Sequence, residues 1–329
     1  MLLGEHSTHQ PDDGGAVREE ACNAMRVAGQ KGIDSGRRTA DDAEVLRLIV
    51  GLASVLVAVV VGCAAPAASP TPAQSSADSP GGGSVNIGAH RLWASCAGHG
   101  SPTVVLEGGT GSTFEVWKTV QAQLAPSHRV CSYDRAGLGR SDPIASPETA
   151  GSADDDLQAL PGALGLKPPY ILVGWSFGGM IVQLHVRRHP AETAGMVLVD
   201  SSSVGLTAVL NALLPPDLLA ELKRQEATGQ APDLDASDRE IEAAPAFPNI
   251  PLIVLAHGKP VLPGGSQDDP WEKAWRSTQV QLASLSPQGR LEVAQQSDHN
   301  IPTEEPDLVV RAVADLTRDR HRVRKSLPV

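Results

Sequence analysis

Residues 174–178 read Gly-Trp-Ser-Phe-Gly, a G-x-S-x-G pattern whose serine could act as a nucleophile. The pattern directly follows the apolar run 170–173, which is typical of a buried strand, and directly precedes a helical pattern over 180–188. A tight turn from a strand into a helix presents the serine hydroxyl above the sheet, and glycines permit such a turn. The helix also directs its first N–H groups and its partial positive charge toward the hydroxyl. We therefore predict that Ser176 is a catalytic nucleophile.

A serine hydroxyl is a weak nucleophile and needs a base. His299 lies in a loop between the last expected strand, 291–294, and the last expected helix, 306–316. In a doubly wound sheet such loops gather at the carboxyl edge of the strands, where Ser176 is also expected. The sequence therefore predicts His299 as the base, with His257, which follows another strand, as the alternative.

The acid that orients the base is harder to identify. Asp200 directly follows the strand expected at 196–199 and is the preferred residue. No carboxylate directly follows the strand at 252–255, so Asp268 and Asp269 stay open as alternatives. Asp298 adjoins His299 and is expected to point away from it.

Acyl transfer also requires hydrogen-bond donors for the developing oxyanion. We expect the backbone N–H of Phe177, directly after the nucleophile, to supply one donor. The loop after the strand at 103–106 is expected to supply the other, through the N–H of Gly109 or Thr110.

Short apolar runs alternate with longer amphipathic stretches around these residues, which favours a mostly parallel sheet with helices on both faces. Residues 204–246 carry no strand pattern, and their helical patterns are broken by prolines and glycines. We predict that this segment forms a small helical cap over the sheet.

These motifs together resemble the α/β-hydrolase superfamily over residues 88–320. The resemblance is carried by four segments, which are 107–111, 133–141, 174–179 and 297–301. It implies an α/β-hydrolase fold, with a mostly parallel, doubly wound sheet of about eight strands and a small helical cap. The sequence departs from the family pattern at Glu107 and Trp175, where histidine is frequent, and in the missing carboxylate after Leu255. The first two departures leave the chemistry intact, whereas the third concerns only the acid.

The N-terminal region is expected to direct export rather than to fold. Residues 48–61 are apolar but shorter than the roughly 20 residues that span a bilayer, and they match the core of a signal peptide. They end at Gly62-Cys63, which resembles a bacterial lipobox with Cys63 as the lipidated residue. A short membrane anchor or an ordinary cleaved signal is the alternative. Because residues 1–44 are polar and end in acidic residues, we hypothesise that translation begins near Val45.

Four segments follow from these patterns: a leader at 1–62, the lipidated cysteine with an Ala/Pro/Ser/Gly-rich linker at 63–84, a catalytic domain at 85–322 and a tail at 323–329. The expected location is the outer face of a bacterial cytoplasmic membrane, either lipid-anchored or secreted. The resemblance makes the strands at 91–96 and 129–133 neighbours. It therefore implies a disulfide between Cys96 and Cys131, which export would permit; two free buried thiols are the alternative.

Composition limits the partners. The formal net charge is −11, which argues against nucleic acid because phosphates require clustered Lys and Arg. No metal or organic cofactor is implied, and the only membrane contact expected is the lipid anchor. Epoxide hydrolases and haloalkane dehalogenases share the fold but use Asp at the nucleophile position, so Ser176 argues against both.

The sequence thus predicts a serine esterase-like hydrolase that cleaves a small-molecule ester or a related acyl bond through an acyl-enzyme. An inactive surface binding protein of the same fold is one alternative. A cofactor-free haloperoxidase or acyltransferase using the same triad is another.

Overall fold

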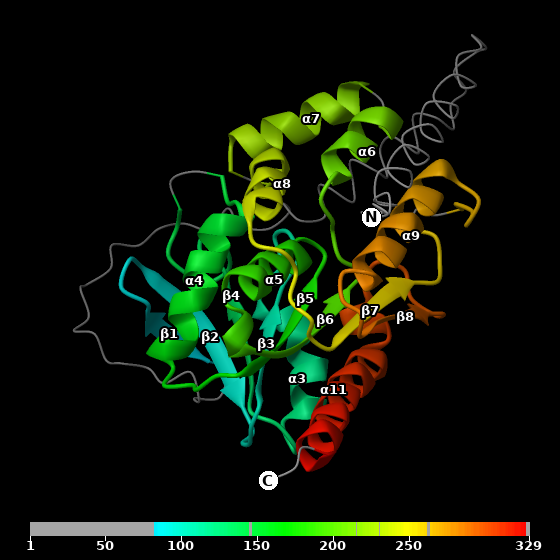
Figure 1. Cartoon of the computed structure of the whole chain (residues 1–329). Coiled ribbons are helices and arrows are strands. Elements are labelled where there is room, and N and C mark those ends of the chain that lie inside the picture. The colour runs from blue at the N-terminus through cyan, green and yellow to red at the C-terminus, as the bar shows by residue number, and fades with distance from the viewer. Residues whose placement is uncertain (1–81, 145–146, 215, 230, 262–263, 327–329) are drawn as a thin grey trace, which may run out of the picture.

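The computed structural model describes residues 82–144, 147–214, 216–229, 231–261 and 264–326, with the backbone alone at 218 and 319–326. Its centre is an eight-stranded sheet in the order β1-β2-β4-β3-β5-β6-β7-β8. The strands are Gly83–Asn86 (β1), Arg91–Ala97 (β2), Thr103–Glu107 (β3), Val130–Asp134 (β4), Tyr170–Trp175 (β5), Thr193–Val199 (β6), Leu252–His257 (β7) and Gly289–Ala294 (β8). β2 is antiparallel to both of its neighbours, and the remaining neighbours run parallel. This sheet confirms the predicted fold class (Figure 1).

The central strands are apolar runs, and helices cover both faces of the sheet that they form. Strands β3, β5, β6 and β7 are buried along their whole length, as parallel strands between two helical layers must be. Side chains alternate between two separate cores: Leu172 and Val254 contribute to one, whereas Ile171 and Ile253 contribute to the other.

The two cores define the two helical layers. Helices α3 (Lys118–Leu124), α10 (Ile301–Glu304) and α11 (Pro306–Ser326) cover one face of the sheet. Helices α4 (Ala150–Ala163), α5 (Phe177–Arg188) and α9 (Pro270–Ala283) cover the other (Figure 1). A 3-10 helix, Phe114–Trp117, directly precedes α3.

The helical cap predicted at 204–246 consists of α6 (Leu206–Leu213), α7 (Pro216–Ala227) and α8 (Leu234–Ala243). It is inserted between β6 and β7 and stands above the carboxyl edge of the sheet (Figure 1). Glu240 on α8 anchors it, because this carboxylate accepts from the N–H of Gly151 at 2.6 Å and from the Thr149 hydroxyl at 2.9 Å. The cap is thereby joined to the first turn of α4.

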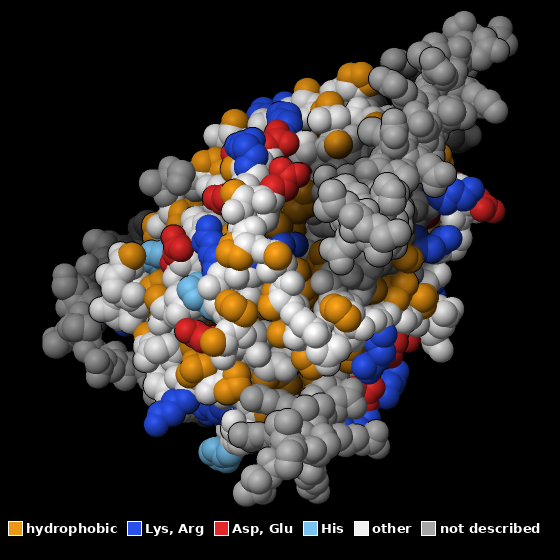
Figure 2. All heavy atoms as spheres, in the orientation of Figure 1, with side chains coloured by type: hydrophobic (Ala, Val, Ile, Leu, Met, Phe, Trp, Pro, Cys, Tyr) orange, Lys and Arg blue, Asp and Glu red, His pale blue; other side chains and the backbone are white. Residues whose placement is uncertain are grey.

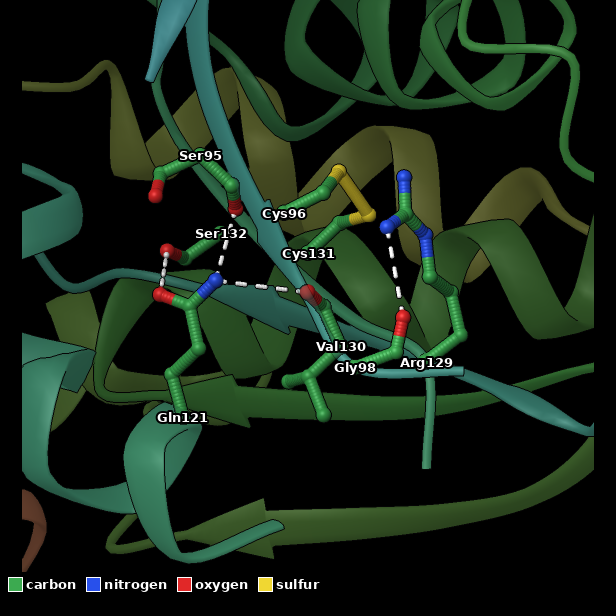
Figure 3. Close-up of a disulfide and its surroundings, with 8 residues drawn as sticks. All are labelled: Ser95, Cys96, Gly98, Gln121, Arg129, Val130, Cys131 and Ser132. Carbon is green, nitrogen blue, oxygen red and sulfur yellow. Dashed lines mark hydrogen bonds between the residues drawn. A yellow bond between two sulfur atoms is a disulfide. The ribbon is translucent and has the colours of Figure 1, made fainter. Parts of the chain in front are cut away.

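A disulfide joins the two strands that the resemblance made neighbours. Cys96 of β2 lies directly opposite Cys131 of β4, and their Sγ atoms are bonded (Figure 3). Beside the disulfide, the buried amide of Gln121 donates to the carbonyls of Ser95 and Val130 at 2.8 and 3.2 Å. The antiparallel edge is therefore tied to α3 as well as to β4.

Two element boundaries differ from the sequence analysis. β1 begins at Gly83, inside the segment predicted as linker, because its pairing with β2 starts there. The last helix continues to Ser326, ten residues beyond the predicted end and into the predicted tail. Its polar final turns carry no apolar period that would mark them as helix.

Of the residues described, no helix is both long and apolar enough to cross a bilayer. Cys63 and the predicted leader lie outside the described residues. On the face shown in Figure 2, Lys and Arg side chains are scattered among acidic and uncharged ones rather than gathered into one patch.

Candidate active site

Ser176 occupies a sharp turn between β5 and α5. Its backbone has φ 55° and ψ −124°, and its N–H donates to the Val199 carbonyl at 3.1 Å. A Cβ at Gly178 would lie 2.4 Å from the Gly108 carbonyl oxygen, and one at Gly174 would lie 2.5 Å from the Gly178 oxygen. Only glycine fits at these close approaches, which explains the G-x-S-x-G spacing.

His299 is brought to this turn through Trp175, the residue before the serine. The Trp175 indole N–H donates to the His299 carbonyl at 2.8 Å, and the two ring centroids are 5.4 Å apart. His299 and Ser176 line the same cavity. The structure therefore brings the predicted nucleophile and the predicted base together.

Asp200 lies behind His299. Its Oδ2 accepts from His299 Nδ1 at 2.6 Å, and the Asp200 side chain is fully buried. Burial alone would raise the pKa of this carboxyl, but hydrogen bonds and positive charge from His257 and His299 outweigh it and hold the pKa below its usual range. Asp200 is thus placed to orient the base as a carboxylate.

The alternative acids lie elsewhere. Asp268 is 90% exposed and pairs with Lys273 at 3.2 Å. Asp269 precedes α9 and accepts from the Ser266 N–H at 2.8 Å. Asp298 accepts from the backbone N–H and the side-chain amide of Asn300, so it points away from the imidazole beside it, as expected.

His257, the alternative base, is not placed to reach Ser176. Its side chain is 4% exposed, its Nδ1 faces Asp200 Oδ2 at 2.8 Å, and its Nε2 faces Glu272 Oε2 at 2.7 Å. With both ring nitrogens engaged by carboxylates, it has no nitrogen left to accept a serine proton.

The expected oxyanion donors surround the serine. Phe177 is the first residue of α5, and the first N–H groups of a helix have no partner within it. Gly109 lies against the nucleophile, since a Cβ built there would be 3.1 Å from Ser176 Cβ. Thr110 lines the same cavity as Ser176.

Arg135 holds the loop that carries Gly109. Its guanidinium donates to the carbonyls of Gly108 and Gly109, and it forms ion pairs with Glu107 at 3.0 Å and Glu148 at 2.7 Å. Because the two carbonyls point toward Arg135, the loop is fixed beside the serine. Burial raises the pKa of Glu107 to about 7 despite the nearby arginine.

A cavity of about 650 Å³ opens above Ser176, between the sheet and the cap. The described residues that line it are mostly apolar and include one side-chain carboxylate, Glu226, but no Lys or Arg. The larger apolar side chains from the helices of the cap and from α9 are Leu206, Leu210, Leu222, Leu234, Trp271 and Trp275.

Sequence reasoning missed three supporting side chains: Arg135, Glu272 and Trp275, whose indole donates to Asp200 Oδ1 at 2.9 Å. Trp275 and Glu272 share a face of α9 at a three-residue spacing, which was the signal available. Their contacts with Asp200 and His257 depend on how α9 packs, and no motif marks them.

A second polar cluster lies between α4 and α5. Atoms of Asp154, His185 and His189 that could hold a metal ion lie within 4.8 Å of one another. Both Asp154 oxygens are already engaged, one by His185 at 2.7 Å and one by Arg188 at 2.9 Å. The Asp154 carboxylate is thus paired with Arg188 of the same chain. Asp154, His185 and His189 do not line the cavity above Ser176.

Comparison with known proteins agrees with this architecture. A family model described as alpha/beta hydrolase fold matches residues 102–250. The uncharacterized protein YqjL of Bacillus subtilis is 29% identical over 220 residues, covering 67% of this chain and 85% of YqjL. An AB hydrolase superfamily protein of Gibberella zeae is 33% identical over 148 residues, but the match covers 43% of this chain and only 46% of that protein.

Solved structures are similar in fold at lower identity. An esterase from Thermogutta terrifontis has a TM-score of 0.51 at 20% identity, covering 70% of this chain and 94% of the esterase. An enol-lactonase from Burkholderia xenovorans LB400 also has a TM-score of 0.51 at 20% identity, covering 71% of this chain and 99% of that one. The family model over residues 102–250 and these neighbours agree with the α/β-hydrolase fold of this chain.

Proposed function

We propose that this chain, which has the α/β-hydrolase fold, is a serine hydrolase that cleaves a carboxylic ester or a related acyl bond through an acyl-enzyme. The observation that carries the proposal is the contact of 2.6 Å between Asp200 Oδ2 and His299 Nδ1, with His299 and Ser176 lining one cavity. The matches to hydrolase-fold proteins are consistent with it.

The proposed mechanism assigns one role to each of these groups. His299 Nε2 takes the proton of the Ser176 hydroxyl as its oxygen attacks the substrate carbonyl. The backbone N–H groups of Phe177 and of the Gly109–Thr110 loop stabilise the oxyanion. The protonated imidazole, stabilised by Asp200, then gives its proton to the leaving group. Water, activated by the same imidazole, releases the acyl group and restores the serine.

The cavity favours a neutral, largely apolar substrate. Its walls are leucine and tryptophan side chains, which gain free energy by covering hydrocarbon. Glu226, the one carboxylate in the described lining, is paired with Lys223 at 2.9 Å, and no Lys or Arg lines the cavity to bind an anionic acyl or alcohol group. A volume of about 650 Å³ is within the range that encloses a drug-sized ligand.

Labelling with a fluorophosphonate probe tests the nucleophile. The wild-type chain is expected to be labelled and Ser176→Ala is not, while Ser202→Ala, which removes another hydroxyl lining the cavity, keeps the label. Turnover of p-nitrophenyl esters of graded chain length is expected to fall by at least about 10⁴-fold in Ser176→Ala.

Other outcomes of this experiment identify the alternatives. A wild-type chain that is neither labelled nor active on any ester would contradict the proposal and favour a binding protein of the same fold. Product analysis with competing alcohols separates hydrolysis from acyl transfer. Labelling that persists in Ser176→Ala and disappears in Ser202→Ala would show that the nucleophile is Ser202 instead.

We also propose that the enzyme is exported and held at the outer face of the cytoplasmic membrane by a lipid on Cys63. The apolar run 48–61 that ends next to this cysteine supports the proposal. The disulfide between Cys96 and Cys131 is compatible with it, because such bonds persist mainly outside the cytoplasm.

A further inference from the structure

Behind Asp200 lies a buried ion pair that the mechanism above does not use. His257, at the end of β7, stands between Asp200 after β6 and Glu272 on α9. The exposed fractions of the His257, Asp200 and Glu272 side chains are 4%, 0% and 2%. We refer to His257 and Glu272 as the His257–Glu272 pair.

We propose that the His257–Glu272 pair positions the Asp200 carboxylate and sets the acidic limit of the pH range in which His299 can act as base. The proposal rests on the serine-hydrolase function proposed above. It assigns roles to two residues that touch neither substrate nor serine and act through Asp200.

The proton count at His257 follows from the contacts. Nδ1 lies 2.8 Å from Asp200 Oδ2, and Nε2 lies 2.7 Å from Glu272 Oε2. With both carboxylates ionised, each can only accept hydrogen bonds, so both ring nitrogens carry protons and the ring is a cation. Burial lowers the pKa of His257, but the bonds and charges of Asp200 and Glu272 outweigh it and raise the pKa to about 9.

Both carboxylates are held in place by further donors. Glu272 Oε1 accepts from the Val261 N–H at 2.8 Å. Asp200 Oδ1 accepts from the Trp275 indole at 2.9 Å and from the His257 N–H at 3.1 Å. The Asp200 carboxylate therefore cannot rotate away from His299 without losing bonds on both of its oxygens.

The charge of Asp200 is shared between two imidazoles. Oδ2 accepts from His299 at 2.6 Å and from His257 at 2.8 Å. Because the His257 cation is closer to Asp200 than the Glu272 anion is, the pair offsets part of the negative charge that would otherwise favour protonation of His299. Removing the cation leaves the full charge of Asp200 to act on His299, which is the change that the pH profile of the reaction measures.

The protons of His257 do not move during the reaction. The serine proton goes to His299 Nε2 and then to the leaving group, which balances the step without the pair. The titratable groups in contact with the cluster come from three elements: Asp200 from the loop after β6, Glu272 from α9 and His299 from the loop before α10.

Glu272→Gln is the test variant because it keeps the shape and the hydrogen bond but removes the charge. A neutral His257 can still donate from Nδ1 to Asp200 and accept at Nε2 from the side-chain amide that the substitution introduces. We expect the acidic limb of the pH profile of kcat/KM to move upward by about half to one pH unit, with KM unchanged at its optimum. Glu292→Gln on β8, outside the network, is the matched control and keeps the wild-type profile.

The folding stability supplies an independent readout. The folded-state pKa of His257 lies above the 6.5 of an unconstrained histidine, so the pair stabilises the fold fully below about pH 6.5 and loses this effect as pH rises through about 9. The wild-type Tm is therefore expected to fall across this interval, and the fall is smaller in Glu272→Gln.

Nitrogen-15 NMR of the histidine rings decides the protonation without any turnover. At pH 7.5 both His257 nitrogens are expected to be protonated in the wild type and only one in Glu272→Gln. If Glu272→Gln does not fold, the double variant His257→Gln/Glu272→Gln, which carries no charge at either position, is expected to show the same upward shift.

Two failures can be told apart. A wild-type chain with two protonated His257 nitrogens but no esterase activity would overturn the proposed function and leave the ion pair standing. An active wild type whose pH profile coincides with that of Glu272→Gln, or whose His257 is neutral at pH 7.5, would overturn the role of the pair alone.

Discussion

Ser176 and Asp200 share a backbone conformation that non-glycine residues rarely adopt. Among the residues that the structure describes, they are the two non-glycine residues with positive φ, at 55° and 42°. Such a conformation costs about 1–3 kcal/mol at each position and is concentrated at functional sites. The Ser176 N–H donates to Val199 and the Asp200 N–H donates to Leu255, so each strained residue is held by the next strand of the sheet.

Asp200→Asn tests the identity of the acid. The amide cannot hold His299 in the tautomer that accepts a proton from serine, so kcat is expected to fall by about 10³–10⁴-fold in ester hydrolysis. Asp268→Asn, at an exposed position, serves as the matched control with wild-type kcat. Full activity in Asp200→Asn together with a loss in Asp268→Asn would transfer the role to the other aspartate.

At the scale of elements, a disulfide and an arginine connect β4 to β2 and to the loop after β3. The disulfide joins β2 to β4, and Arg135, directly after β4, holds the loop after β3 through two carbonyls. β4 is therefore connected on one side to β2, at the antiparallel edge, and at its carboxyl end to the loop that carries Gly109. The position of Gly109 beside Ser176 depends on this order of strands.

Removing the disulfide is expected to reduce stability more than catalysis. In Cys96→Ser/Cys131→Ser the free energy of unfolding falls by about 3–4 kcal/mol, because a crosslink across 35 residues restricts the unfolded chain. Urea unfolding measures this difference, and kcat measured at 25 °C is expected to stay within a few-fold of wild type. Equal unfolding midpoints for the double variant and the oxidised wild type would contradict the prediction.

At the scale of the whole molecule, the cap closes the site. Helices α6–α8 are inserted between β6 and β7, shortly after Asp200. They lie above the carboxyl edge of the sheet and form the roof of the cavity (Figure 1). Most of the described apolar walls of the cavity come from the cap and α9, whereas Ser176 and His299 come from the loops at the edge of the sheet. Substitutions in the cap can therefore change the cavity without moving these two residues.

Cys63→Ser tests how the whole chain is located. In a bacterial host the wild-type chain is expected to incorporate a radiolabelled fatty acid and to sediment with membranes. Cys63→Ser is expected to lose the label and most of the membrane association, since a lipid supplies about 0.8 kcal/mol for each buried CH₂ group. Ser69→Ala, in the predicted linker that follows Cys63, is the control and keeps both properties. Recovery of unlabelled wild-type chain from the cytoplasm would contradict the proposed anchor.

The sequence alone indicated the fold class and predicted Ser176 and His299, and it favoured Asp200 while leaving Asp268 and Asp269 open. Ser176, Asp200 and His299 each follow a strand that local hydrophobicity makes recognisable, and parallel strands carry such residues to one edge. The disulfide required in addition the strand order that the resemblance implied.

Only the tertiary structure shows that Asp200, rather than Asp268 or Asp269, contacts His299, and only it shows the His257–Glu272 pair and the contacts of Arg135. These contacts join residues between 15 and 99 positions apart in the chain. Their distances depend on how α9 and the loops pack over the sheet. Local sequence patterns set which element a residue belongs to, but the packing of elements decides which side chains meet.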